Sequence, residues 1–192
     1  MPPPKTPADT NLDPNTLVQA IAQASLLRGT FTLRSGRTST YYLDKYRFST
    51  KPAILKQLGE LFKVQIGQIE KEVGTIHQLA GAELGGIPLV TAAGLSTGLT
   101  TIFVRNAKKD YGTAKQVEGI INKGDTVIFI EDVATTGGQA LEAIEVLKSL
   151  GAKVPAMITV IDREEGAREN IEGAGVKFVA LFTKSDLGVE DE

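Results

Sequence analysis

The stretch from Thr126 to Ala140, TVIFIEDVATTGGQA, contains a hydroxyl-bearing, glycine-rich segment directly before a helical pattern. Its adjacent glycines, Gly137 and Gly138, allow positive φ angles and a close approach of the backbone to a ligand. The hydroxyls of Thr135 and Thr136, with the backbone N–H groups of a helix N-terminus, can donate hydrogen bonds to phosphate oxygens. This part of the stretch therefore predicts a phosphate site.

Two carboxylates, Glu131 and Asp132, come immediately before the glycine-rich segment. They would repel a phosphate, but they can accept hydrogen bonds from the hydroxyls of a ribose or from the water shell of a metal ion. A 5-phosphorylated ribose fits both parts of the stretch, and the alternative is a tight strand-to-helix turn with solvated acids. The patterns GxxxxGK[ST] and GxGxxG are absent, so the nucleotide loops that they describe are not indicated.

The elements around this stretch place it at the end of a buried strand. Residues 126–130 are apolar and β-branched, which is typical of a strand buried on both faces of a parallel sheet, and the acids follow where that strand should end. After the loop, apolar residues recur at the spacing of one helical face, and Gly151 is placed to stop the helix. These apolar residues are Leu141, Ile144, Leu147 and Leu150.

Further apolar runs predict the other strands of the same sheet, at residues 75–80, 100–104, 156–161 and 176–182. The first three end, like 126–130, in loops rich in glycine or charge: GAELGG at 81–86, Arg105, and Asp162-Arg163. Because ligands bind outside the carboxyl ends of the strands in an open α/β sheet, we expect these loops to converge on one site. His77, the one histidine of the chain, lies in the first run and is expected to be a hydrogen-bonded structural residue.

The N-terminal part of the chain predicts a tail and two helices. Residues 1–12 are proline-rich and polar, so we expect a flexible tail. Asp13 and Pro14 suit the cap and the first residue of a short helix. A long helix is predicted over residues 49–72, where apolar residues have helical spacing and two glycines weaken the pattern.

Two polar segments could complete a site. Residues 31–44 read as a hairpin, with Arg34 and Arg37 beside its turn, although two such arginines alone are more typical of a solvated edge. Residues 106–119 are long, polar and without periodicity, which indicates either a lid or a disordered loop.

The composition limits the class of protein. With 192 residues the chain suits one domain, expected over residues 13–192, and its net charge of −2 gives no field that would attract nucleic acid. It has no cysteine, which excludes disulfides, thiolate metal sites and a cysteine nucleophile. No apolar run approaches the roughly 20 residues that span a bilayer, and the N-terminus lacks the apolar core of a signal peptide. We therefore expect a cytoplasmic protein without a membrane partner.

The residues VIFIEDVATTGG resemble the phosphoribosyl pyrophosphate (PRPP) motif of the type I phosphoribosyltransferases. Across the chain, FTLRSGRTSTYY, GAELGGIPL, VRNAKKDYGT, IEDVATTGG and VIDREEG are similar to the ordered motifs of orotate phosphoribosyltransferases. The resemblance implies an α/β fold with an open, mainly parallel sheet flanked by helices over a core of residues 49–185. It also implies a small N-terminal hood, made of a helix and a hairpin, over residues 13–48.

The activity that this resemblance implies is transfer of the 5-phosphoribosyl group from PRPP to orotate, which gives orotidine 5′-monophosphate and pyrophosphate. Magnesium would be held through PRPP and water, with no direct protein ligand. The displacement at ribose carbon 1 would pass through an oxocarbenium-like transition state. A homodimer is also implied, in which the loop at residues 106–118 of one subunit reaches over the site of the other.

The resemblance assigns roles to individual residues. The catalytic residues would be Lys109, Asp132 and Arg105. Orotate would be bound by Arg34, Thr135 and Arg163. PRPP would be bound by Arg105, Asn106, Lys109, Tyr111, Glu131, Asp132, Val133, Ala134, Thr135, Thr136, Gly137, Gly138 and Gln139.

Several of these positions depart from the usual pattern of the family. Asn106 stands where many members have a second basic residue, and Tyr111 replaces a common histidine. Gly85 occupies a position where some members have lysine, and Arg34 occupies one where lysine is frequent. Glu131 begins an acid pair that is often Asp-Asp.

Two alternative functions stay open at this point. One is another type I phosphoribosyltransferase, such as a purine-salvage enzyme, and the hairpin at residues 31–44 argues against it. The other is a regulator that senses PRPP without turnover. Such regulators usually carry a DNA-binding domain, for which this chain has no room.

Overall fold

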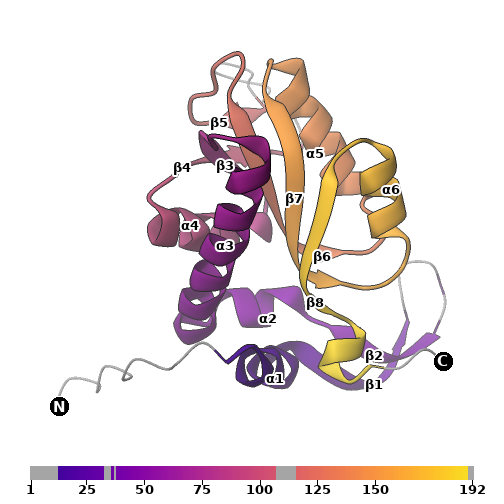
Figure 1. Cartoon of the computed structure of the whole chain (residues 1–192). Coiled ribbons are helices and arrows are strands. Elements are labelled where there is room, and N and C mark those ends of the chain that lie inside the picture. Colours follow the sequence, from indigo (N-terminus) through magenta and orange to yellow (C-terminus); the bar gives the residue numbers. More distant parts are fainter. Residues whose placement is uncertain (1–12, 33–35, 37, 107–115, 190–192) are drawn as a thin grey trace, which may run out of the picture.

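A computed structural model of the chain describes residues 13–32, 36, 38–106 and 116–189. These residues form an open sheet with helices against both faces, and a smaller group of elements lies at one end of that sheet (Figure 1). The expected flexible tail, residues 1–12, lies outside the described residues. The division of the chain into a hood and a core within one domain stays a prediction. No helix among the described residues is both long and apolar enough to cross a membrane.

The main sheet is open and mainly parallel, which confirms the fold class expected from the resemblance. Its strands are β3 (Gln78–Ala82), β4 (Thr100–Val104), β5 (Val117–Glu118), β6 (Thr126–Ala134), β7 (Lys153–Asp162) and β8 (Lys177–Thr183). They lie in the order β5-β4-β3-β6-β7-β8, and the pairs are parallel except for β4 and β5. The chain order reverses between β3 and β6, and such switch points are where open α/β sheets bind ligands.

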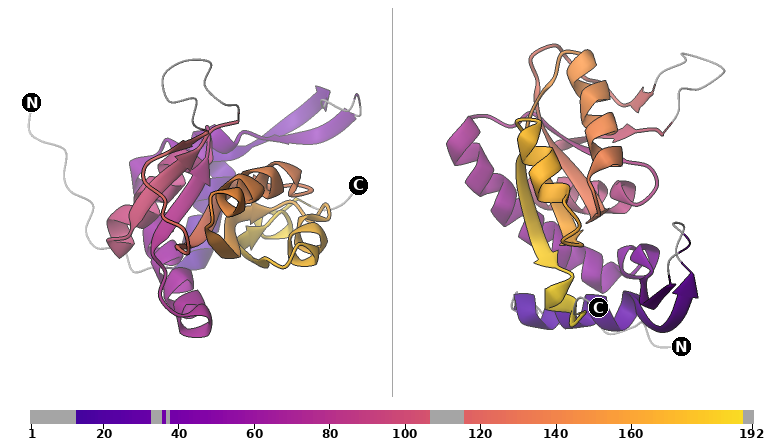
Figure 2. Two further views of the ribbon diagram at one scale, coloured as in Figure 1. Left: turned by 90° about the horizontal axis from the view of Figure 1, so that it is seen from above. Right: turned by 90° about the vertical axis from the view of Figure 1, so that its right-hand side faces the viewer.

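Strand β6 is buried on both faces and contributes to two hydrophobic cores, as its apolar sequence predicts. The covering helices are α3 (Pro52–Val73), α4 (Gly86–Thr97), α5 (Gly138–Ser149) and α6 (Ala167–Gly173). Ile128 and Ile130 pack in the core with α3 and α4, whereas Val127 and Phe129 pack in the core with α5 and α6. Figure 2 shows these two helical layers on opposite sides of the sheet. The division follows from the strand, since successive side chains point to opposite faces.

The length of β6 differs from the sequence prediction. The strand was expected to end at Ile130, but it continues to Ala134, so Glu131 and Asp132 lie within it. The physical reason is unequal pairing. Strand β3 pairs with β6 only as far as Ile130, whereas β7 pairs with it as far as Ala134. The two acids therefore stand in a part of β6 that has left its β3 neighbour.

The start of β3 is another correction. The strand begins at Gln78, so His77 lies just before it and not inside it. The exposed imidazole accepts a hydrogen bond at its Nδ1 from the backbone N–H of Thr126, at 3.0 Å. The backbone N–H of His77 donates in turn to the carbonyl of Thr126 at 2.9 Å. These bonds join the entry of β3 to that of β6, which confirms the expected structural role.

The N-terminal elements lie beside the carboxyl ends of the strands (Figure 1). They are α1 (Pro14–Ser25), β1 (Leu26–Thr32), β2 (Thr38–Leu43) and α2 (Lys45–Ser49). The predicted start of α1 is confirmed, because the Asp13 carboxylate accepts hydrogen bonds from the Asn15 N–H and the Thr16 hydroxyl, at 3.1 and 2.6 Å. The hairpin begins five residues before the predicted range, at Leu26, since the pairing of β1 with β2 starts at Leu26 and Leu43.

The polar segment expected over residues 106–119 contains a short strand. Val117 and Glu118 pair antiparallel with Val104 and Phe103, so β4 and β5 form a hairpin at the edge of the sheet. Residues 107–115, which include the expected lid residues Lys109 and Tyr111, lie outside the described residues.

The helix predicted over residues 49–72 is confirmed as α3, which begins three residues later and ends one residue later than predicted. Helix α2 ends at Ser49, and α3 begins at Pro52 after a break at Thr50 and Lys51. Proline has no N–H to donate and restricts the residue before it, so it favours the first turn of a new helix. Helix α3 is continuous through both of its glycines.

The two glycines of α3 differ in their surroundings, which predicts opposite effects of alanine. A Cβ atom at Gly59 would lie 2.6 Å from Ser96 Oγ and 2.9 Å from the Ala92 carbonyl oxygen, because α3 and α4 approach closely there. A Cβ atom at Gly67 would meet nothing within 4 Å. In urea unfolding, Gly59→Ala should lower the free energy of unfolding by about 1–3 kcal/mol. Gly67→Ala, the matched control, should raise it by about 0.5–1 kcal/mol. Equal effects of the two substitutions would contradict the close helix contact.

Candidate active site

The predicted phosphate segment forms a cavity at the carboxyl end of β6. The segment Thr135–Gly137 joins β6 to α5, and Gly137 has a φ of 77°, which favours glycine. The Nδ2 of Asn170 on α6 donates to the Thr136 carbonyl at 2.9 Å and holds the segment in place. The cavity has a volume of about 150 Å³, and we call it the loop cavity. Its lining residues are Lys45, Glu131, Val133, Ala134, Thr135, Thr136, Gly137, Gly138, Gln139, Ala140 and Met157.

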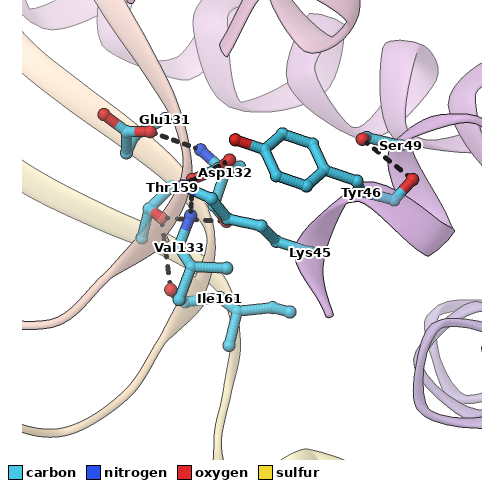
Figure 3. Close-up of polar contacts among 8 residues, drawn as sticks. All are labelled: Lys45, Tyr46, Ser49, Glu131, Asp132, Val133, Thr159 and Ile161. Atoms are coloured by element: carbon cyan, nitrogen blue, oxygen red, sulfur yellow. Dashed lines mark hydrogen bonds and ion pairs between the residues drawn. The ribbon is translucent and has the colours of Figure 1, made fainter. Parts of the chain in front are cut away.

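The two acids of β6 have different surroundings. The side chain of Glu131 is half-buried and lines the loop cavity, whereas Asp132 is 1% exposed and does not line it. Successive residues of a strand point to opposite faces, but the Glu131 carboxylate bends back, and its Oε1 accepts a hydrogen bond from the Asp132 N–H at 3.0 Å. Figure 3 shows the Glu131 side chain pointing away from that of Lys45. The expectation that both acids hold ribose hydroxyls stays a prediction, and in this conformation only Glu131 reaches the cavity.

Asp132 is held by backbone and by a lysine that sequence reasoning did not identify. Its Oδ1 accepts a hydrogen bond from the Val133 N–H at 2.6 Å and another from Lys45 Nζ at 3.1 Å. Its Oδ2 lies 3.0 Å from the same ammonium, close enough for an ion pair although not aligned for a hydrogen bond. Lys45 is the first residue of α2 and lies 87 positions earlier in the chain. No pattern around Lys45 signals this pairing, because it depends on how the N-terminal elements dock against the sheet.

Gly85 explains how the carboxylate of Asp132 fits at this place. A Cβ atom at position 85 would overlap with Oδ2 of Asp132, so the conformation of Asp132 requires glycine there. The ammonium next to Asp132 comes from Lys45.

Burial and charge shift the protonation of two of these groups. Burial raises the pKa of Glu131 well above its usual range, and the neighbouring Asp132 carboxylate raises it further, while Lys45 opposes the shift. For Lys45, burial alone would lower the pKa of the ammonium. The Asp132 carboxylate, with a smaller contribution from Glu131, outweighs burial, so that the pKa is raised and Lys45 stays charged.

Arg163, the expected orotate ligand, follows β7 and contacts the hairpin. Its Nη2 donates to the Tyr41 hydroxyl at 3.3 Å and lies 2.7 Å from Glu165 Oε1. Its guanidinium also lies 5.9 Å from the centre of the Tyr41 ring. The Nε atom is buried and has no hydrogen-bond partner among the described residues. Arg34, expected to bind orotate with it, lies outside the described residues.

Arg105 and Asn106 line a second hollow beside the loop cavity, of about 200 Å³. Gln139 lines both spaces, so the hollow at the end of β4 is the neighbour of the loop cavity. The Arg105 Nη1 lies 3.5 Å from Glu118 Oε1, and the Asn106 N–H donates to Glu83 Oε1 at 2.8 Å. The structure thus brings Arg105 and Asn106 to the same edge of the sheet as the phosphate segment.

A larger hollow than the loop cavity lies elsewhere. It has a volume of about 740 Å³ between β5 and α5, and exposed apolar residues such as Ile120 and Leu150 line it. Its charged lining residues, Glu142 and Glu145, are acidic, so it does not suit a phosphorylated ligand.

The donor set fits a metal that arrives with its ligand. Among the described residues, no three His, Cys, Asp or Glu side chains form a cluster able to hold a metal ion. The Glu131 carboxylate at the loop cavity can accept hydrogen bonds from water around an ion that phosphate oxygens carry.

Comparisons with known proteins add to this geometry. No family model matches the chain. The orotate phosphoribosyltransferase of Natronomonas pharaonis is 42% identical over 172 residues, which cover 89% of this chain and 95% of that protein. The solved orotate phosphoribosyltransferase of Aeropyrum pernix has a TM-score of 0.77 and 32% identity, over 89% of this chain and 95% of that one. The Mycobacterium tuberculosis orotate phosphoribosyltransferase in complex with PRPP has a TM-score of 0.75 and 29% identity, over 92% and 99%.

The sheet order, the segment after β6 and the solved structures define a type I phosphoribosyltransferase fold. The identity to relatives over nearly their full length goes further. The chain belongs to the orotate phosphoribosyltransferase family.

The raised pKa of Glu131 predicts how this residue affects stability. Because the folded-state pKa lies above the unfolded value of about 4.3, folding favours the protonated carboxyl, and that stabilisation is lost as the pH rises through the folded pKa. Glu131→Gln should therefore raise the Tm, and the gain should grow from acidic to neutral pH. Thermal unfolding across that range is the measurement, with the exposed Glu145→Gln as control. A Tm gain that is equal at every pH would contradict the burial of Glu131.

Proposed function

We propose that the chain transfers the 5-phosphoribosyl group from PRPP to orotate, giving orotidine 5′-monophosphate and pyrophosphate. One observation carries this function: the segment Thr135–Gln139 lines a cavity next to Glu131 at the switch point of the sheet, in a member of the orotate phosphoribosyltransferase family. A spectrophotometric assay for loss of orotate, dependent on PRPP and magnesium, tests it directly. Persistence of orotate under these conditions would overturn the assignment.

The residues have complementary tasks in this reaction. Backbone N–H groups and hydroxyls of residues 135–139 hold the 5-phosphate at the start of α5. Glu131 accepts hydrogen bonds from ribose hydroxyls, and its charge favours an oxocarbenium-like sugar. Arg105, with Lys109 from outside the described residues, stabilises the charge of the departing pyrophosphate. Positioning and electrostatic stabilisation supply most of the rate acceleration.

Magnesium is proposed to accompany PRPP, where it neutralises pyrophosphate oxygens and makes pyrophosphate a better leaving group. In this proposal the chain contributes no direct metal ligand. Glu131 orients the water around the ion, and Arg105 supplies a second positive group on the same side.

The two alternative functions are less well supported. Assignment as a purine-salvage enzyme does not agree with the membership of the orotate phosphoribosyltransferase family. It also leaves the contact between Arg163 and the hairpin residue Tyr41 unexplained. A PRPP sensor without turnover does not account for relatives that are named as transferases over nearly their full length. A cytoplasmic location stays a prediction.

Arg163 predicts the choice of base. Orotate has a carboxylate that a guanidinium can bind in a bidentate manner. In the structure the Arg163 guanidinium contacts Glu165 and Tyr41 instead. Arg163→Ala should raise the KM for orotate about 10- to 100-fold, the range for loss of a hydrogen bond to a charged group. PRPP binding without orotate, measured by calorimetry, should change little. Arg168→Ala is a matched control, since Arg168 pairs with Glu172 on α6. Equal weakening of both ligands would speak against the role of Arg163.

A homodimer with a shared site is the last part of this proposal. Lys109 of one subunit would serve the site of the other. Lys109→Ala should lower kcat roughly 10²- to 10³-fold, the typical loss for a donor to developing negative charge. Mixing the impaired Lys109→Ala and Asp132→Asn dimers under subunit exchange should raise activity above that of either parent, because each mixed dimer contains one intact site. Verified exchange without recovered activity would exclude a shared site.

A further inference from the structure

The loop cavity has a wall that comes from the N-terminal elements. Lys45 is the lining residue that α2 supplies, and it is the one cationic residue among those that line this cavity in the described part of the chain. The other charged residue that lines the cavity is Glu131, a carboxylate. A phosphate dianion entering this space meets a negative group on β6 and a positive group on α2.

The ammonium of Lys45 is held in place by a built contact. Asp132 is 1% exposed, and its carboxylate receives Lys45 Nζ at 3.1 Å on Oδ1 and at 3.0 Å on Oδ2 (Figure 3). The Val133 N–H fixes Oδ1 at 2.6 Å, and the absence of a side chain at Gly85 leaves room for Oδ2. The ring of Tyr46 lies 5.7 Å from the same ammonium. Losing the cation would leave a buried charge unpaired, so the pair resists separation.

The contact with Asp132 leaves some of the hydrogen-bond donors of the Lys45 ammonium available. An ammonium has three N–H donors, and the hydrogen bond to Asp132 uses one of them. The Lys45 side chain is 36% exposed, whereas that of Asp132 is 1% exposed, so the accessible side of the pair is the ammonium. A ligand in the loop cavity therefore meets the ammonium before it meets the Asp132 carboxylate.

We infer that Lys45 is a substrate-binding residue that contacts the phosphate of the 5-phosphoribosyl group, and that Asp132 is its positioning residue. This inference rests on the proposed function and adds a residue to the same site. The cation offsets the repulsion between the incoming phosphate and Glu131. Asp132 keeps the cation at the cavity wall before the ligand arrives.

Calorimetry with ribose 5-phosphate and, separately, with inorganic pyrophosphate tests this role at constant ionic strength. Lys45→Met should raise the Kd for ribose 5-phosphate about 10- to 100-fold, the range for a lost hydrogen bond to a charged group. Lys45→Arg should recover part of the affinity, because it keeps the charge but changes its geometry. Lys51→Met, which removes an exposed lysine six positions away, should bind like the unmodified protein. The Kd for pyrophosphate should stay within about threefold of its original value in all three variants.

A double-mutant cycle tests the role of Asp132. If Asp132 acts through Lys45, the Kd for ribose 5-phosphate should be about the same for Asp132→Asn, Lys45→Met and the double variant. Additive losses would overturn the positioning role, because Asp132 would then contact the ligand by itself. Lys45→Gln is read in the same way should the methionine variant not fold.

The other outcomes overturn the inference for Lys45. Tighter binding by Lys45→Met would mean that Lys45 blocks the site. A lowered Tm with an unchanged Kd would mean that Lys45 is structural only. A larger loss for pyrophosphate than for ribose 5-phosphate would place Lys45 at the other end of the substrate. The orotate assay on the unmodified protein separates failure of this inference from failure of the proposed function. If the unmodified protein consumes orotate and Lys45→Met binds ribose 5-phosphate with an unchanged Kd, only the inference for Lys45 is overturned.

Discussion

The site depends on the fact that the two edges of β6 are paired over different lengths. This strand keeps its hydrogen bonds to β7 as far as Ala134, but it pairs with β3 only as far as Ile130. Upstream of Ile130, the strand is closed on both edges and fills two cores with alternate side chains. Beyond it, the edge of β6 that faced β3 is unpaired, and the loop cavity lies at this end of the strand. The acids, the phosphate segment and Lys45 all gather where the strand has lost this neighbour.

Much of this arrangement could be predicted from the sequence, because local patterns encode it. The apolar run of β6, the glycines after it and the apolar face of α5 are consecutive in the chain, and each has its own signature. The convergence of Arg105, Arg163 and residues 135–139 follows from the rule for carboxyl ends of parallel strands. The predicted end of β6 was wrong by four residues. The strand continues because β7 pairs with it as far as Ala134, and no local pattern at Glu131 reveals this pairing.

Lys45 shows what sequence reasoning cannot reach. Its partner, Asp132, is fixed by how α2 docks against the sheet, and the two residues share no motif. The same docking brings Tyr41 of β2 against Arg163. The N-terminal elements thus reach the site at Asp132 of β6 and at Arg163 after β7. They form part of the active-site wall, and an account of this site that considers the sheet alone omits that wall.

The contact of Gly85 with Asp132 limits how this protein can vary. A side chain at position 85 would displace the Asp132 carboxylate, and a displaced carboxylate would leave the Lys45 ammonium without its partner. Three segments that are distant in the chain therefore form one epistatic unit, in which each residue is acceptable only in the presence of the others. A lysine at position 85 is unfavourable in this background, although it could become acceptable once Lys45 and Asp132 had changed first. Single substitutions at positions 45, 85 and 132 will therefore be poorly tolerated, whereas combined substitutions at these positions can be tolerated.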